Sequence, residues 1–328
     1  LAEMGLLVEQ EGRRYPARAA VLLFGTNAAF RQLLPRPLVD CQRFALPRAE
    51  ADTGERWSDR VVMEENLVQS WQRMVDWYQG LTERPFQVDP ASLQREDAPP
   101  DYRAFREAMV NLLIHQDYSD HARKPEIRSY TDQTVFWNPG DAFATGVDLL
   151  EPGEKEVRNP RVVTAFRRIG LSENAGWGLR DVFRNWQQLG HVPPEIHNDK
   201  GRKSFELVLL KEQLLSERQL LLQGSLGVHL SDEQARAFAL ACRQSQVSIP
   251  ELKSVTGLTS HDAVALANSL VTQGLFEARE SGRIYCLAQH LRERFRPQAP
   301  NGTGGADLST EQVGRGSSDL STEQVGEH

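Results

Sequence analysis

The sequence predicts an α+β protein with more than one domain, and three observations lead to this prediction. The chain has 328 residues, whereas an ordinary domain has roughly 100–200. Between about residues 100 and 210, hydrophobic periodicity indicates a helix, two strands, two helices and a further strand. From residue 231, three short helices and a hairpin are indicated, an order typical of a winged-helix domain.

The composition is typical of a globular protein, because 40% of the residues are hydrophobic and 25% are charged. The net charge of −7 provides no overall attraction to nucleic acids, so any DNA contact must be local. Cys41, Cys242 and Cys286 are scattered, which favours a reducing cytoplasm and argues against disulfides or a zinc site. No apolar run of about 18 residues and no signal peptide is found, so no membrane span is expected. Because the first residue is Leu, we expect a trimmed N-terminus or a fragment of a longer protein.

Residues 1–95 are expected to form an N-terminal subdomain and a connecting helix. The apolar run at residues 19–25 indicates a buried strand or a short helix that ends at Gly25. From Val61 to Gln79, apolar residues recur at helical spacing, which predicts a long amphipathic helix that Pro85 closes.

Residues 96–212 are expected to form the main domain, and its first helix carries the most informative pattern in the chain. Asp101 is the expected N-cap of this helix, which should end near Asp117. Glu107, Asn111 and His115 are four residues apart, so a carboxylate, an amide and an imidazole share one helical face. Because the other positions are mostly apolar, the helix should be buried, and its polar stripe should face a cavity or be paired internally.

Strand and helix signals follow this helix to the end of the main domain. Residues 126–130 and 134–137 alternate around Asp132-Gln133, which predicts a hairpin that breaks at Asn138-Pro139-Gly140. A short helix, a second helix and a last strand are expected at Val162–Ile169, from Gly178 to about Leu189, and at Ser204–Leu210.

Residues 213–296 are expected to form the winged-helix domain, and residues 297–328 a disordered tail. The tail repeats Asp-Leu-Ser-Thr-Glu-Gln-Val-Gly at 307–314 and 319–326, and has too few apolar groups to fold. The expected elements of the domain are helices at Ser231–Arg243, Ile249–Thr256 and Ser260–Gln273, and strands at Leu275–Arg279 and Arg283–Leu287.

The polar stripe has the groups that a site for a metal-bound nucleotide needs. The amide oxygen of Asn111 is a hard ligand for Mg²⁺, and the carboxylate of Glu107 can accept a proton from water. Glycines at Gly140, Gly176 and Gly178 would let the backbone approach phosphates. Candidate cations for the phosphate charge are Arg158 and Arg180.

Two other interpretations of these residues stay open. In the first, the residues are structural: Glu107 pairs with an arginine, Asn111 forms hydrogen bonds with a loop, and the glycines form turns. In the second, His115, Asp117 and His121 bind Zn²⁺ or Mn²⁺, although no further ligand cluster accompanies them in the sequence.

Several motifs between about residues 5 and 210 together resemble one protein family. They are Ala20-Val-Leu-Leu-Phe-Gly25, Arg106-Glu107-Ala-Met-Val-Asn111-Leu-Leu-Ile-His115-Gln-Asp117-Tyr118-Ser119, Asn138-Pro139-Gly140, Arg158-Asn159-Pro160, Phe166-Arg-Arg-Ile-Gly170-Leu and Gly176-Trp-Gly178-Leu-Arg180. With these motifs, the chain resembles the ATPase-like module of bacterial Schlafen-AlbA or RecG-C-terminal-like transcriptional regulators. That module is a divergent member of the GHKL group (gyrase, Hsp90, histidine kinase, MutL), whose Bergerat fold is an α/β sandwich.

The resemblance implies ATP and Mg²⁺ as cofactors. In GHKL enzymes the matching helix supplies a Glu as general base and an Asn that holds Mg²⁺, which would assign these roles to Glu107 and Asn111. The sequence Asn111-Leu-Leu-Ile-His115 also resembles the Asn-Leu-Leu-x-Asn of sensor kinases. The other implied nucleotide-site residues are His115, Asp117, Asn138, Gly140, Arg158, Asn159, Gly176, Gly178 and Arg180.

The chain departs from the family pattern in its glycine motifs. GHKL proteins normally recognise adenine with the Asp of an Asp-x-Gly-x-Gly box, whereas the equivalent turn here is Asn138-Pro139-Gly140-Asp141. The glycine-rich lid is reduced to Gly176-Trp177-Gly178, so ATP hydrolysis is expected to be weak at most. No Gly-x-x-x-x-Gly-Lys-Ser/Thr loop occurs, so helicase motor activity is not expected. In the family an AlbA-like domain usually precedes the module, and residues 1–95 would include the end of the region linked to it.

The predicted winged helix has a weakly basic surface. Its expected reading helix, Ser260–Gln273, contains no Lys or Arg, which weakens its attraction to phosphate. An alternative is a winged helix used for packing or dimerisation. Candidate base contacts are Ser260, His261 and Asn268, and candidate phosphate contacts are Lys253, Arg279 and Arg283.

These patterns lead to one expected function and one alternative. We expect a cytoplasmic, ATP-binding and DNA-binding transcriptional regulator or defence-related nucleic-acid factor, in which the nucleotide acts as a switch. The protein is expected to form homo-oligomers. The alternative is a non-enzymatic scaffold with a degenerate ATPase fold and a winged helix used for oligomerisation or protein interaction.

Overall fold

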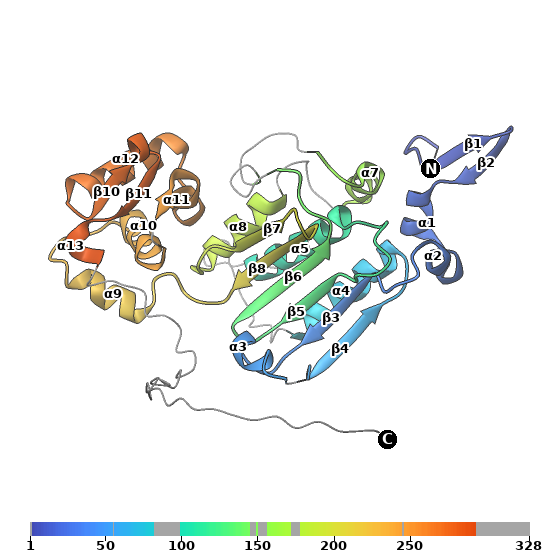
Figure 1. The fold of residues 1–328 in the computed structure, drawn as a ribbon, viewed down its shortest axis with the longest axis horizontal. Coiled ribbons are helices and arrows are strands. Elements are labelled where there is room, and N and C mark those ends of the chain that lie inside the picture. The colour runs from blue at the N-terminus through green and yellow to red at the C-terminus, as the bar shows by residue number, and fades with distance from the viewer. Residues whose placement is uncertain are drawn as a thin grey trace, which may run out of the picture. The chain divides into compact units, whose positions relative to one another are not determined.

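A six-stranded mixed sheet organises the main part of the computed structural model (Figure 1). The structure describes residues 2–54, 56–81, 99–144, 149, 156–171, 178–244 and 246–292. The strand order is β4-β3-β5-β6-β8-β7; β3 and β5 are parallel, and the other neighbours are antiparallel. The strands are β3 (Val39–Arg43), β4 (Asp59–Met63), β5 (Glu126–Ser129), β6 (Gln133–Pro139), β7 (Glu195–Asp199) and β8 (Ser204–Leu210).

The hairpin of β5 and β6 and the last strand, β8, confirm the sequence expectations, whereas three other strands do not follow from them. β3 and β4 precede residue 95, so the sheet extends across the domain boundary predicted there. β7 is an edge strand that pairs with β8, and its residues are alternately exposed and half-buried. The sheet therefore includes two strands from before the predicted domain and one edge strand within it that the sequence patterns do not predict.

Helices α4 and α5 pack against one face of this sheet, and α7 and α8 pack against α5. Their buried side chains, including Met74, Met109, Phe166 and Val182, join Phe136 of β6 in the main hydrophobic core. The apolar run at residues 19–25 forms a helix rather than a strand. The helices of this part are α1 (Arg18–Phe24), α2 (Asn27–Leu33), α3 (Arg48–Ala51), α4 (Leu67–Leu81), α5 (Pro100–His115), α7 (Pro160–Arg168) and α8 (Gly178–Gln188).

The opposite face of the sheet carries buried charge. Val39 and Cys41 of β3 lie in the main core, so Asp40 between them points to the other face. Asp40 is fully buried and accepts hydrogen bonds from Arg60 (Nε, 2.9 Å; Nη2, 2.7 Å) and from Lys124. Burial raises the pKa of Asp40, but these hydrogen bonds outweigh burial and hold the pKa below its ordinary value.

The predicted helix from Val61 to Gln79 is wrong in its first part. Val61 and Val62 belong to β4, where they pair with β3, and α4 begins only at Leu67. The error has a physical cause, because a short strand joined directly to an amphipathic helix extends the run of apolar residues without a glycine between them.

The predicted N-cap of α5 is also wrong. The helix begins at Pro100 after Pro99, which has no side chain that could accept a capping hydrogen bond. Asp101 lies in the first turn, and its Oδ2 accepts a hydrogen bond from the hydroxyl of Tyr78 at 3.0 Å. A carboxylate in this position still interacts favourably with the helix dipole.

Residues 216–292 form several short helices around a small sheet. Phe238, Leu252, Leu270 and Tyr285 lie at the centre of a second core, to which Val192 also contributes. The three helices and the hairpin expected between residues 231 and 287 are present, and α9 and β9 are additions to that expectation. The elements are α9 (Glu217–Gly224), α10 (Asp232–Arg243), β9 (Val247–Ser248), α11 (Ile249–Thr256), α12 (Ser260–Thr272), β10 (Phe276–Arg279), β11 (Ile284–Leu287) and α13 (Gln289–Arg292), with the sheet order β10-β11-β9.

The N-terminal residues form a hairpin outside the six-stranded sheet. Near the N-terminus, β1 (Leu7–Gln10) and β2 (Arg13–Pro16) form a separate two-stranded hairpin before α1. The tail predicted to be disordered, residues 297–328, lies outside the described residues, as does Pro85. Within the described ranges, the helices are too short or too polar to cross a membrane.

Candidate nucleotide site

The polar stripe of α5 is paired internally and faces the first residue of α8. The Asn111 side-chain amide donates to the Glu107 carbonyl oxygen (2.9 Å) and to Glu107 Oε1 (3.3 Å). A Cβ atom at Gly178 would lie 2.5 Å from Glu107 Oε1 and 2.8 Å from Asn111 Nδ2. Glycine therefore lets α8 begin this close to the two polar side chains without moving their terminal atoms. The structure thus brings together Glu107, Asn111 and Gly178.

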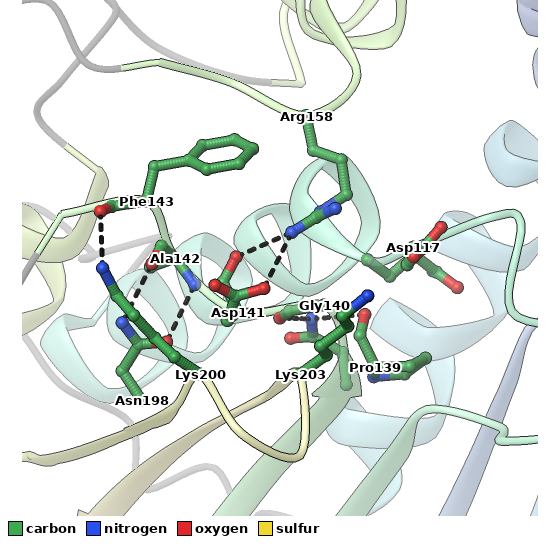
Figure 2. Close-up of polar contacts among 12 residues, drawn as sticks. Asp117, Pro139, Gly140, Asp141, Ala142, Phe143, Arg158, Asn198, Lys200 and Lys203 are labelled. Carbon is green, nitrogen blue, oxygen red and sulfur yellow. Dashed lines mark hydrogen bonds and ion pairs between the residues drawn. The ribbon is translucent and has the colours of Figure 1, made fainter.

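A second group of predicted residues meets at the turn after β6 (Figure 2). Gly140 has φ +105°, and a Cβ atom there would lie 3.0 Å from Arg158 Nε and 3.1 Å from the Asp117 nitrogen. The Asp117 N–H donates to the Pro139 carbonyl, and the Gly140 N–H donates to the Lys203 carbonyl, both at 2.7 Å. This turn needs glycine both for its conformation and for the close approach of Arg158.

Arg158 is the main cation at this turn. Its Nη2 donates to the carbonyl oxygen of Asp141 (2.9 Å) and to Asp141 Oδ1 (3.2 Å), and its guanidinium lies 5.0 Å from the centre of the Phe143 ring. The Nε atom of Arg158 is buried and has no hydrogen-bond partner. An unused buried N–H suits an anionic oxygen atom, because a buried donor without an acceptor is costly.

His115 and Asp117 have different charge states in this environment. Burial and, to a smaller extent, the positive charge of Arg158 together lower the pKa of His115 to about 4, so the imidazole is neutral at pH 7. Burial raises the pKa of Asp117, but hydrogen bonds from Ser119 and the charge of Arg158 outweigh burial, so the pKa lies below its ordinary value. A neutral ring and a carboxylate therefore flank Arg158.

The amide groups of Asn138 and Asn159 hold the backbone around the site. Asn138 Nδ2 donates to the carbonyl oxygens of Pro139 (3.1 Å) and Gly140 (3.3 Å). Asn159 Nδ2 donates to the carbonyl oxygens of Ile114 and Gln116, both at 2.9 Å, at the end of α5. These donors are thus engaged before any ligand arrives, which favours a structural role for both amides.

The loop after α5 is held by arginines that the sequence patterns do not single out. Arg36 is 9% exposed and donates to the carbonyls of Asp120 (2.6 Å) and Asp117 (3.3 Å) and to Gln116 Oε1 (3.2 Å). Burial lowers the pKa of Arg36 from its usual high value, although the nearby acidic groups oppose this effect. Arg18 of α1 donates to the Tyr118 carbonyl. No local motif predicts these contacts, because their partners lie far along the chain.

The turn between β7 and β8 adds two lysines that the sequence patterns do not single out either (Figure 2). Asn198 exchanges hydrogen bonds with the N–H and carbonyl groups of Ala142, both at 2.9 Å, so the turn is fixed beside the Gly140 segment. Lys200 Nζ donates to the Phe143 carbonyl at 3.2 Å, and Lys203 lies beside Gly140. The polar, alternating residues of β7 give no sequence signal that the two lysines lie beside the Gly140 turn.

The remaining predicted site residues have simpler positions. Arg180 lies in the first turn of α8, and Gly176 lies outside the described residues. Across the described part of the chain, no group of three or more His, Cys, Asp and Glu side chains could hold a metal ion, so the interpretation of His115, Asp117 and His121 as metal ligands gains no support.

The candidate DNA-contacting residues lie around α12 and the β10–β11 hairpin. Lys253 Nζ donates to Ser260 Oγ at 2.9 Å, and Asn268 Oδ1 accepts a hydrogen bond from the Tyr285 hydroxyl at 3.4 Å. The side chain of His261 is 94% exposed. Arg279 and Arg283 are exposed on either side of the turn between the two strands.

Comparisons with known proteins support the class of the main domain. Residues 122–209 match the family described as "Putative ATP-dependent DNA helicase recG C-terminal", an ATPase-like domain. This match includes Gly140, Arg158 and Gly178 but begins after α5, so Glu107 and Asn111 lie outside it. It covers less than half of the chain.

A solved structure gives a second comparison. The DIP2311 protein from Corynebacterium diphtheriae is 18% identical and has a TM-score of 0.52; the match covers 91% of this chain and 50% of that protein. The chain thus spans about half the length of this structural relative, and the likeness concerns the fold alone. No curated protein matches the sequence. The mixed sheet and the family match together define an ATPase-like domain.

Proposed function

We propose that the chain binds Mg²⁺-ATP between α5, α8 and the Gly140 turn, and that the nucleotide controls how the C-terminal part contacts DNA. The observation that carries the proposal is the pair formed by Glu107 and Asn111, which Gly178 approaches so closely that a Cβ atom there would have to move the ends of both side chains. The ATPase-like family match to residues 122–209 supports the choice of ligand. We further propose that the chain belongs to the Schlafen-AlbA regulators of the GHKL group and that it is located in the cytoplasm.

The residues present fit a magnesium-bound nucleotide. Asn111 would offer its Oδ1 to Mg²⁺, with the phosphates and water completing the shell, as is usual for this ion. Glu107 would accept a proton from the attacking water, and Arg158 would use its unpaired Nε–H on a phosphate oxygen. When bound, ATP supplies the phosphoanhydride bond and the negative charge that these groups recognise. Hydrolysis at this site would be slow.

α8 connects this site with the C-terminal elements. The helix begins at Gly178, against the polar stripe, and near its end Gln187 Nε2 donates to the carbonyl oxygen of Val255 in α11 at 3.0 Å. A metal ion on Asn111 would have to displace the start of α8. Because a helix moves as a rigid element, this displacement would reach α11 through Gln187. The nucleotide would thereby act as a switch.

We propose that α10, α11, α12 and the β10–β11 hairpin form a winged helix that contacts DNA. Ser260, His261 and Asn268 would face bases, while Lys253, Arg279 and Arg283 would face phosphates. Helix α12 has no Lys or Arg, so binding should be weak, and its salt dependence should reflect only the few cations around the helix.

The switch is tested by fluorescence anisotropy of a labelled DNA duplex at low salt, with and without Mg²⁺-ATP. We expect the DNA affinity to change with nucleotide in the wild type and to change little in Gln187→Ala, which keeps both sites but loses the contact with α11. Arg279→Gln with Arg283→Gln should weaken binding under all conditions, whereas Arg14→Gln on the exposed β2 strand should not. An affinity that is equal with and without nucleotide would refute the switch.

A second function is favoured by one observation. The exposed face of α12 carries Val264, which is 37% exposed, but no Lys or Arg. Such a surface suits contact with another protein or a second copy of the chain better than contact with phosphate. In that case the ATPase-like fold is a scaffold, and the duplex should not bind at any salt concentration.

A further inference from the structure

A cavity of about 740 Å³ lies away from the candidate nucleotide site. It is lined by Asp101 and Phe105 near the start of α5 and by Thr134 near the start of β6, whereas the nucleotide site lies towards the last residues of the same two elements. Its volume is that of a small-molecule site, because such sites usually measure about 300–1,000 Å³. None of the residues assigned to the nucleotide site lines it.

The walls of this cavity combine aromatic rings with basic groups. Tyr78, Phe105 and Trp186 contribute rings; Tyr78 and Phe105 are stacked with their centres 3.8 Å apart. Arg43 and Lys211 also line the cavity. This mixture of rings and a few convergent polar groups is typical of ligand sites.

Lys211 and Arg43 form no ion pair among the described residues. Lys211 Nζ donates instead to the carbonyl oxygen of Tyr130 at 2.6 Å. Burial lowers the pKa of Lys211; the charge of Asp132 raises it in part, and the charge of Arg43 lowers it again. Burial also lowers the pKa of His191 on the same wall. Like charges gathered in a cavity destabilise one another, and an anion would relieve this repulsion.

The acidic residues of the cavity are already engaged by aromatic donors. Asp59 Oδ2 accepts a hydrogen bond from Trp77 Nε1 at 3.1 Å, and Asp101 Oδ2 accepts one from the Tyr78 hydroxyl at 3.0 Å. One oxygen of each carboxylate thus accepts a hydrogen bond from an aromatic side chain, and within the part of the chain that the structure describes neither carboxylate forms an ion pair with Lys211 or Arg43.

We propose that this cavity binds a small aromatic molecule that carries one acid group. The acid group, a carboxylate, sulfonate or phosphate, lies against Lys211 and Arg43, and the ring lies among Tyr78, Phe105 and Trp186. The anion is favoured because a cation or a neutral molecule would leave Lys211 and Arg43 without an ion-pair partner. This site is independent of the proposed nucleotide site and does not require it.

Two dyes that differ in a single acid group test the proposal on the full chain. Anilinonaphthalene sulfonate carries one sulfonate, and N-phenyl-1-naphthylamine is its neutral counterpart. In fluorescence titrations we expect saturable binding of one sulfonate dye per chain, about tenfold tighter than the neutral dye, since one charge-assisted contact is worth about that factor. Equal affinity for the two dyes would overturn the proposal.

Substitutions locate the dye within the molecule. Lys211→Gln and Arg43→Gln should each weaken sulfonate binding about fivefold to tenfold, whereas Lys200→Gln, the same change on an exposed turn, should leave it unchanged. Because Arg43 is exposed, its variant should fold even if the Lys211 variant does not. Undiminished binding to the Arg43 variant, or displacement of the dye by Mg²⁺-ATP, would place the dye elsewhere and refute the site.

Discussion

At the scale of single residues, Gly178 has the most restricted environment in the candidate site. Gly178→Ala would place a methyl group 2.5 Å from Glu107 Oε1 and 2.8 Å from Asn111 Nδ2, so both side chains or α8 must move. We expect a loss of about 1–3 kcal/mol in the free energy of unfolding, which is typical of overpacking. Urea denaturation measures this change.

Gly80→Ala is the matched control for this substitution. A Cβ atom at Gly80 in α4 would meet no atom within 4 Å, so alanine there should be neutral or stabilise the helix by about 0.5–1 kcal/mol. If the two alanine variants were equally stable, the contact between α8 and the polar stripe would be wrong.

His115 has the most strongly shifted histidine pKa in the site. The pKa of the folded state is about 4, below the value of about 6.5 expected after unfolding. Between these values the unfolded chain binds a proton that the folded chain does not, so stability should fall as the pH drops from about 6.5 to about 4. His115→Gln should reduce this slope.

Proton NMR follows the His115 ring directly. Its signal should titrate near pH 4 in the folded protein and near pH 6.5 in urea, since unfolding removes the burial that lowers the pKa. A folded-state titration near 6.5 would mean that the ring is open to water and that it does not lie behind Arg158.

At the scale of secondary-structure elements, the end of α5 depends on one side chain. Asn159→Asp replaces an amide that donates to the carbonyls of Ile114 and Gln116 with a carboxylate that repels them. We expect a loss of about 1–3 kcal/mol in stability, measured by urea denaturation. Asn27→Asp, at the exposed start of α2, makes the same chemical change and should be neutral or slightly stabilising. Equal effects of the two changes would contradict the capping role of Asn159.

The sequence predicts some elements well because their signals are local. The helix of the polar stripe, the β5–β6 hairpin and β8 each have a clear period and a nearby turn, and the structure contains all three. β3 and β7 are not predicted, because pairing with other strands, rather than a local sequence pattern, makes these residues strands. β3 pairs with β5, which lies far along the chain, and β7 is a polar edge strand. β4 and α4 are predicted as one continuous helix because both carry apolar residues.

The same distinction applies to the candidate site. The spacing of Glu107 and Asn111 places them together on one helix, and the hydrogen bond between them follows from that spacing. The approach of Gly178 and the anchoring by Arg36 depend on how distant segments pack, which a single sequence does not encode locally. Sequence motifs therefore indicate candidate site residues, and the packing of distant segments determines which of these residues are in contact.

At the scale of the whole molecule, Arg36 ties the N-terminal residues to the loop after α5. Arg36→Met would remove a buried guanidinium that donates to Asp117, Asp120 and Gln116, and should cost about 3 kcal/mol of stability. It should also weaken Mg²⁺-ATP binding, because the loop positions Asp117 beside Gly140.

Arg31→Met provides the comparison for this prediction. Arg31 makes an ion pair with Glu64 at 2.8 Å, and both side chains are at least half exposed, so its loss should cost less than about 1 kcal/mol. Thermal unfolding with and without Mg²⁺-ATP reports both stability and binding. If Arg36→Met and Arg31→Met lowered the stability of the protein equally, the N-terminal residues would have no role in holding the loop.

The central claim is that α5, α8 and the Gly140 turn form a nucleotide pocket, and calorimetric titration of Mg²⁺-ATP into the full chain tests it most directly. The account predicts saturable binding to the wild type, weakened at least about tenfold by Asn111→Ala and unchanged by Asn27→Ala on exposed α2. The absence of heat from a folded wild-type sample, or equal affinity for the Asn111 variant, would contradict the account.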